Sequence, residues 1–176
     1  MIIKEQLIGP LNNQIRNEFA NMFSYLAISA YFDDEGLPEL SAFFGSQSLD
    51  EQLHAMKFVN FMLETGVKPI IPGLPEVRND FASAEAAVQF ALDQEVKTTE
   101  QINHLVSIAL AEGDHTTNTF LQWFVTEQVE EVDTMSNLLQ TVRHAGGNLL
   151  RVEDYVIRHM PAVAGGGAAA ESTASA

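Results

Sequence analysis

Four long segments of helical periodicity, each ending at glycine, constrain the fold of this chain most strongly. Their hydrophobic residues recur at steps of three and four. The glycines that follow them are Gly36, Gly66, Gly113 and the pair Gly146 and Gly147. A helical period closed by glycine is typical of helices that end in a left-handed turn. We predict helices over residues 8–35, 38–65, 84–112 and 115–145.

The starts of three of these helices are also visible in the sequence. Pro38 suits a first helical turn, while Ser83 and Asp114 can cap the two helices that follow them. At about 1.5 Å per residue each helix is about 40 Å long, which exceeds the usual globular helix. The sequence therefore predicts an all-α four-helix bundle.

The connections predict the topology of that bundle. The first and second helices, and the third and fourth, are joined by short links that force antiparallel neighbours. Residues 65–82 contain Pro69, Pro72 and Pro75, which favour an extended path. At about 3.3 Å per residue this segment reaches up to about 59 Å. We predict one long crossover between the second and third helices.

A short fifth helix is predicted after Gly147, followed by a low-complexity tail. Its apolar face consists of Leu149, Val152, Val156 and Met160. That face needs a partner, which another subunit could supply. Residues 1–160 suit one globular domain, and the Ala/Gly-rich residues 161–176 are predicted to be disordered.

Composition restricts the chemistry and the partners. The 176 residues include no cysteine, so any metal must have oxygen and nitrogen ligands. The net charge of −15 repels nucleic acid and anionic lipid and attracts cations. The chain contains no apolar run long enough for a membrane span, and its start lacks the apolar region of a secretion signal. We expect a cytoplasmic protein.

A glutamate interrupts the apolar stripe of every long helix near its midpoint. These residues are Glu18, Glu51, Glu95 and Glu131. Packing the helices side by side brings the four carboxylates to similar heights around one axis. His54 follows Glu51 by three residues and therefore lies on the same helical face. The sequence predicts one buried polar cluster.

Such a cluster requires counterions, because buried carboxylates lose solvation and repel one another. Two divalent cations would balance four carboxylates, with His54 neutral. A mostly carboxylate site with one imidazole suits Fe(II) or Mn(II) better than structural zinc or calcium, and we prefer iron. Two Fe(II) ions with open coordination positions could pass electrons to dioxygen or peroxide.

These residues, with Tyr25 and the run LQWFVTEQVEEV at positions 121–132, resemble bacterial non-haem ferritin, of the ferritin-like di-iron carboxylate family. The resemblance covers about residues 5–160. It implies iron storage with ferroxidase activity in a hollow cage of 24 identical subunits. By this similarity Glu18, Glu51 and His54 would hold one iron and Glu51, Glu95 and Glu131 the other, two per subunit. Gln128 would steer oxygen, and Tyr25 would be an electron donor or a hydrogen-bond partner.

Two departures from family patterns qualify the resemblance. Many bacterial ferritins have a third iron site, for which Glu127 and Glu130 match, but the remaining position is Asp50 rather than glutamate. These three residues could equally form a solvated acidic edge. The haem methionine of bacterioferritins falls at Gln52, and Met56 lies a turn farther on, so we predict no haem.

Two other classes of protein remain open at this point. One is a small di-iron peroxidase or oxidase of the rubrerythrin type without mineral storage, which the lack of cysteine disfavours. The other is a metal-free structural bundle. Outside the cluster, Trp123 is expected in the core. The remaining histidines are expected at the surface: His104, His115, His144 and His159.

Overall fold

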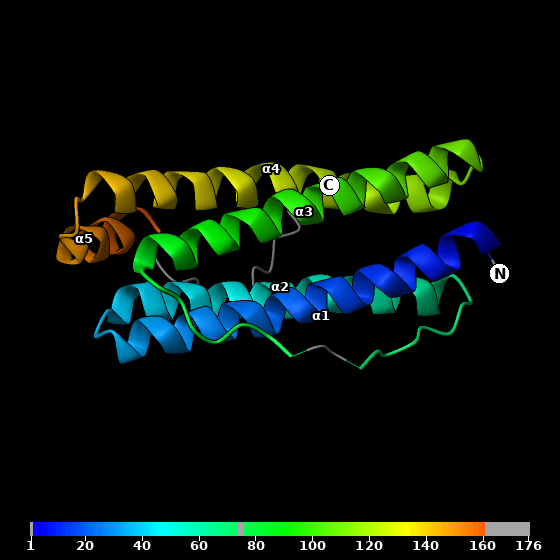
Figure 1. Ribbon diagram of the computed structural model, residues 1–176. Helices are drawn as coiled ribbons and strands as arrows, with labels where there is room; N and C mark the ends of the chain where they lie inside the picture. Colours follow the sequence, from blue (N-terminus) through cyan, green and yellow to red (C-terminus); the bar gives the residue numbers. More distant parts are fainter. Residues whose placement is uncertain (1, 74–75, 161–176) are drawn as a thin grey trace, which may run out of the picture.

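The computed structural model describes residues 2–73 and 76–160, and every regular element in them is an α-helix. The helices are α1 (Glu5–Asp34), α2 (Pro38–Glu64), α3 (Ala84–Ala111), α4 (His115–His144) and α5 (Leu149–His159). Helices α1 to α4 form a bundle and α5 lies across one end of it (Figure 1). The predicted fold is confirmed. Residues 161–176, predicted to be disordered, lie outside the described residues.

The predicted helix boundaries hold to within one residue except at the start of α1. The glycines after the long helices all have positive φ, between 57° and 87°. Ser83 accepts a hydrogen bond from the Ala86 amide, and Asp114 accepts one from the Thr117 amide. Helix α1 begins three residues earlier than predicted and includes Pro10. Pro10 is tolerated because it lies near the end of the helix, where the carbonyl of exposed Gln6 can be solvated.

The crossover follows the predicted path. Residues 65–73 and 76–82 contain no helix, and the connection runs along the bundle from the end of α2 to the start of α3 (Figure 1). Helix α1 packs against α2, α3 packs against α4, and α1 also contacts α3. In the described ranges, no helix is both long and apolar enough to cross a membrane.

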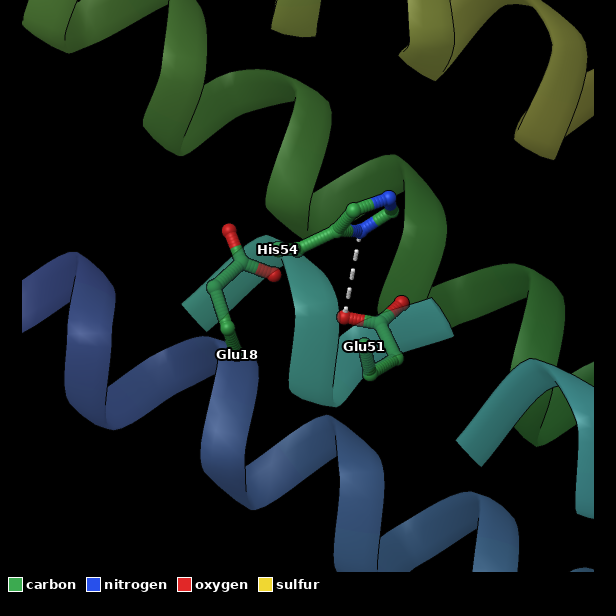
Figure 2. Close-up of side chains that lie close together, drawn as sticks. All are labelled: Glu18, Glu51 and His54. Carbon is green, nitrogen blue, oxygen red and sulfur yellow. Dashed lines mark ion pairs between the residues drawn. The ribbon is translucent and has the colours of Figure 1, made fainter. Parts of the chain in front are cut away.

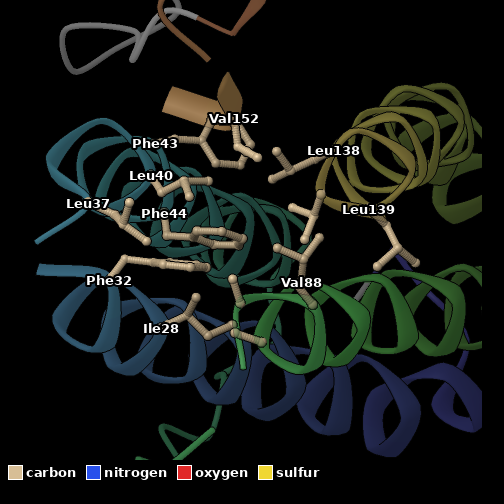
Figure 3. Packing of buried hydrophobic residues seen from close by; sticks show 14 of the residues in the cluster. Ile28, Phe32, Leu37, Leu40, Phe43, Phe44, Val88, Leu138, Leu139 and Val152 are labelled. Atoms are coloured by element: carbon tan, nitrogen blue, oxygen red, sulfur yellow. The ribbon is translucent and has the colours of Figure 1, made fainter. Parts of the chain in front are cut away.

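A polar layer divides the core into two apolar clusters. It contains Glu18, Glu51, Glu95, Glu131 and His54, all buried (Figure 2 shows Glu18, Glu51 and His54). One cluster includes Phe32, Phe44 and Leu138 toward the α5 end (Figure 3). The other includes Leu11, Phe58 and Phe124 toward the opposite end. Hydrophobic packing on both sides therefore holds the carboxylates in the interior.

Helix α5 packs on its own bundle, which corrects the expectation that another subunit could cover its apolar face. Val152 and Val156 are buried in the cluster of Figure 3. The buried Glu153 accepts hydrogen bonds from the backbone amides of Glu39 and Leu40, each at 2.9 Å. Because these amides open α2, a carboxylate from α5 caps that helix and fixes the docking of α5.

We expect Glu153→Ala to lower the free energy of unfolding by about 2 kcal/mol, because it leaves two amides at the start of α2 without their acceptor. Guanidinium unfolding followed by circular dichroism measures the change. The matched control is Asp154→Ala, an exposed neighbour on the same helix, which should change stability little. Equal effects of the two substitutions would contradict the capping role.

Candidate metal centre

Glu18, Glu51 and His54 form one group of candidate ligands. Glu18 comes from α1, and Glu51 and His54 come from successive turns of α2 (Figure 2). One ligand atom of each residue lies within 4.8 Å of the other two. His54 Nδ1 is 3.8 Å from Glu51 Oε2. The spacing of three residues thus places an imidazole and a carboxylate on one face, opposite a carboxylate of the neighbouring helix.

The other face of His54 meets α4. Its Nε2 is 3.9 Å from Glu127 Oε1, and His54, Glu127 and Glu131 also have ligand atoms within 4.8 Å of one another. Glu131 is buried, while Glu127 is half-buried. His54 therefore lies between two groups of carboxylates. Glu18 and Glu51 form one group, and Glu127 and Glu131 of α4 form the other.

Glu95 of α3 completes the layer and is held by two donors. The Tyr25 hydroxyl donates a hydrogen bond to Glu95 Oε1. Gln128 Nε2 donates to Glu95 Oε2 at 3.1 Å and also lies 3.3 Å from Thr99 Oγ1. Both oxygens of Glu95 are thereby fixed in orientation by side chains from α1 and α4.

Burial raises the pKa of all four central carboxyls, because desolvation disfavours their charged forms. The field of Glu51 raises the pKa of Glu18 further. For Glu131, burial and then the charge of Glu95 raise the pKa to about 8. Without a cation, the folded chain therefore favours protonated carboxyls in this layer.

The residues fit a divalent metal ion. Among the described residues, Glu18 Oε2 and Glu51 Oε2 are buried and have no hydrogen-bond partner. Buried polar atoms of this kind are costly unless a ligand satisfies them. Carboxylate oxygens with one imidazole match the preferences of Fe(II) and Mn(II). The group can therefore hold cations that balance the charge of its carboxylates.

The four glutamates and His54 are buried in one layer, as the sequence predicts, although Glu95 belongs to neither group of candidate ligands; one prediction beside the layer is wrong. Trp123 was predicted in the core, whereas it is 41% exposed and its ring lies edge-on to His54. The ammonium of Lys57 lies 4.1 Å from the centre of its ring, a cation–π contact that suits a partly exposed indole. The four other histidines are exposed, as predicted. Asp50 is half-buried and Glu130 is exposed.

One buried residue in contact with the cluster was missed by the sequence analysis. Gln14 donates a hydrogen bond from Nε2 to Glu18 Oε1 at 2.7 Å. The available signal was its position one helical turn before Glu18, which places both residues on the same face of α1.

Comparison with known proteins places this geometry in context. The model of a family described as a ferritin-like domain matches residues 8–145. Ferritin BfrB of Mycolicibacterium smegmatis is 45% identical over 152 residues, covering 86% of this chain and 84% of that protein. A bacterial non-heme ferritin of Staphylococcus aureus is 31% identical, covering 74% of this chain and 78% of that protein. An open pore ferritin of Archaeoglobus fulgidus gives a TM-score of 0.85 at 33% identity, covering 88% and 96% of the two chains.

We expect the stability of the metal-free protein to fall as the pH rises from about 4.5 to about 8. In this window the folded state keeps a proton on Glu131 that the unfolded chain has released, so the folded state binds more protons. One such group contributes up to about 1.4 kcal/mol per pH unit. Urea unfolding at several pH values, with a chelator present, measures the slope.

Glu131→Gln should make this slope shallower, because an amide cannot release the proton. The matched control is Glu100→Gln on the exposed surface of α3, which should leave the slope unchanged. A slope unaffected by Glu131→Gln would show that this carboxyl does not titrate in the window.

Proposed function

The chain belongs to the ferritin-like family, and on that premise we propose that it stores iron and is a ferroxidase. Each subunit oxidises two Fe(II) ions at a centre within its bundle, using O₂ or H₂O₂, and ferric mineral collects inside a cage of subunits. The observation that carries the proposal is the buried layer of four glutamates and His54, in which two carboxylate oxygens have no hydrogen-bond partner among the residues that the structure describes.

Charge balance supports two Fe(II) ions as the bound substrate. Four ionised carboxylates offset their combined charge of +4, and His54 can remain neutral. Because burial raises the pKa of these carboxyls, binding of the cations displaces protons. With O₂ as oxidant, two Fe(II) supply two electrons and yield two Fe(III) and one H₂O₂ after uptake of two protons.

We assign the ligands as two overlapping sets. Glu18, Glu51 and His54 hold one iron, and this set is supported by their mutual distances within 4.8 Å. Glu51, Glu95 and Glu131 hold the other, so Glu51 bridges the two ions. The electrostatic influence of Glu95 and Glu131 on Glu51 supports a central position for that bridge.

Tyr25 and Gln128 orient Glu95, a member of the second set of ligands. Both donate hydrogen bonds to Glu95, so they orient one ligand carboxylate. Gln128 also lines an open pocket of about 510 Å³ between α3 and α4, where Val125, Val129 and Val132 lie beside polar residues such as Asn103 and Asp133. This pocket supports a role of Gln128 in guiding a small apolar oxidant. We assign Tyr25 as a hydrogen-bond partner and a nearby electron donor.

A third iron position rests on fewer contacts. Glu127 supports it, because its carboxylate approaches His54 and groups with Glu131. Asp50 and Glu130 lie in the same acidic neighbourhood, since the charges of both raise the pKa of Glu127 after the effect of burial. We propose that Glu127 takes part in binding and that Asp50 and Glu130 attract the incoming cation.

An apolar stripe on the outside of α2 supports assembly. Leu49, Leu53, Met56 and Leu63 recur at helical spacing and are all exposed, with Leu53 at 46%. Phe23 and Leu26 of the adjacent α1 are exposed as well. Several exposed apolar residues at helical spacing on one face are typical of an interface. We propose a homo-oligomer, with the 24-subunit cage as its form.

We expect Glu51→Ala to lower the initial rate of Fe(II)-dependent O₂ uptake by more than about 100-fold. Loss of a residue that only orients a ligand costs about 10–100-fold, and Glu51 is assigned as a ligand of both ions. The measurement adds two Fe(II) per subunit to iron-free protein and follows O₂ with an electrode.

The matched control for this measurement is Glu100→Ala, which removes an exposed carboxylate of α3 and should keep the wild-type rate. A wild-type rate in Glu51→Ala would refute the ferroxidase assignment. Rapid turnover without accumulation of ferric mineral would instead identify a small oxidase.

We expect the wild-type chain to elute as a very large particle and Leu53→Glu to elute as a much smaller species. The substitution places charge in the apolar stripe, where burial in an interface would desolvate it. Gel filtration with light scattering measures the mass. Val96→Glu, which changes an exposed hydrophobic residue of α3, is the control that should retain the large particle. A wild-type chain that elutes as a monomer would refute the cage.

A further inference from the structure

Gln14 is a buried amide that faces the centre from α1. It is 2% exposed and lies one turn before Glu18. Its Nε2 donates to Glu18 Oε1 at 2.7 Å, a short distance that is typical of a hydrogen bond to a carboxylate. None of the ligand assignments above uses this residue, although an amide without a partner would be costly at this depth.

The neighbours of Gln14 fix which end of the amide faces Glu18. Asn17 Nδ2 lies 3.5 Å from Gln14 Oε1 and supplies a donor to that oxygen. Gln101 Oε1 of α3 lies 3.5 Å from Gln14 Nε2 and supplies an acceptor to that nitrogen. A rotated amide would place its oxygen against Glu18, and the ionised carboxylate that binds a cation can only accept. The nitrogen therefore faces Glu18.

This contact distinguishes the two oxygens of Glu18. Oε1 accepts the hydrogen bond of Gln14, whereas Oε2 has no hydrogen-bond partner among the described residues. The carboxylate also approaches Glu51 and His54. We propose that Gln14 is a positioning residue, which holds Glu18 by Oε1 so that Oε2 is free to bind a divalent cation beside Glu51 and His54.

The opposite side of the layer contains a similar arrangement. There Gln128, a residue of α4, donates a hydrogen bond from Nε2 to Glu95 Oε2 at 3.1 Å. Each amide restricts the rotation of a glutamate before a cation arrives, so less side-chain freedom is lost on binding. The inference rests on the proposed function, because it assigns Gln14 a role in binding the cation that the centre would oxidise.

The test uses Co(II), which binds oxygen and nitrogen ligands and stays divalent under the conditions of the experiment. Calorimetric titration of the iron-free, assembled protein gives the affinity of each site. We expect Gln14→Leu to weaken one of two Co(II) sites per subunit by about tenfold or more and to leave the other near its wild-type affinity. Leucine fills a similar volume but cannot donate.

A matched control separates positioning from general damage to α1. Asn12→Leu also replaces an amide of α1, but Asn12 bonds to the Ile8 carbonyl and the Ile70 amide, away from the centre. It should bind Co(II) as the wild type does. A loss of affinity in Asn12→Leu equal to that in Gln14→Leu would overturn the proposal.

A double-mutant cycle tests whether Gln14 acts through Glu18. In the Glu18→Ala background, Gln14→Leu should cause no further loss of Co(II) affinity, because the carboxylate that it orients is gone. A full tenfold loss in that background would overturn the proposal, and so would wild-type affinity in the single variant. If Gln14→Leu does not fold, Gln14→Asn replaces it, since its shorter side chain cannot reach Glu18 as well.

The outcomes distinguish this inference from the proposed function. If the wild type binds Co(II) at two sites and Gln14→Leu binds equally well, the positioning role fails while the metal centre stands. If the wild type binds no Co(II), the metal centre itself fails, and with it the ferroxidase assignment.

Discussion

The burial of four carboxylates at one level of a helical bundle is the constraint on which the rest of this structure depends. Glu18, Glu51, Glu95 and Glu131 are all less than 9% exposed. Close carboxylates in an apolar interior favour protons or cations, since desolvation and mutual repulsion both oppose ionisation. Among the described residues, no lysine or arginine forms an ion pair with any of them. Protonation or a bound cation therefore makes this layer tolerable, and the proposed metal centre is the second of these solutions.

The two apolar clusters make that burial possible. One cluster lies on each side of the layer along the bundle axis, and aromatic residues such as Phe44 and Phe58 pack close to it. Glu153 ties α5 to the start of α2, and Asp114 accepts the Lys4 amide as well as capping α4. Packing and caps at the two ends thus hold the helices in the register that the central residues require. The stability that they supply offsets the desolvation of the central carboxylates.

The hydrogen bonds around the layer distinguish Glu95 from Glu18. Glu95 accepts from Tyr25 and Gln128 at its two oxygens, whereas Glu18 accepts from Gln14 at one oxygen only. A carboxylate with both oxygens engaged is held more rigidly than one with a free oxygen. This difference gives Glu18 and Glu95 unequal surroundings within the same layer. His54 adds a further asymmetry, because it faces Glu51 on one side and Glu127 on the other.

The sequence by itself determined the helices, their caps, the crossover and the convergence of four glutamates with His54. Periodicity and glycine positions are local signals, and long antiparallel helices bring their midpoints together in only a few ways. Only the tertiary structure decided that α5 packs on its own bundle, that Trp123 lies half-exposed beside His54, and that Gln14 contacts Glu18. The packing of α5 depends on the turn at Gly146 and Gly147, and the other two outcomes depend on the directions of side chains. Each brings together groups whose contact cannot be predicted from a short stretch of sequence.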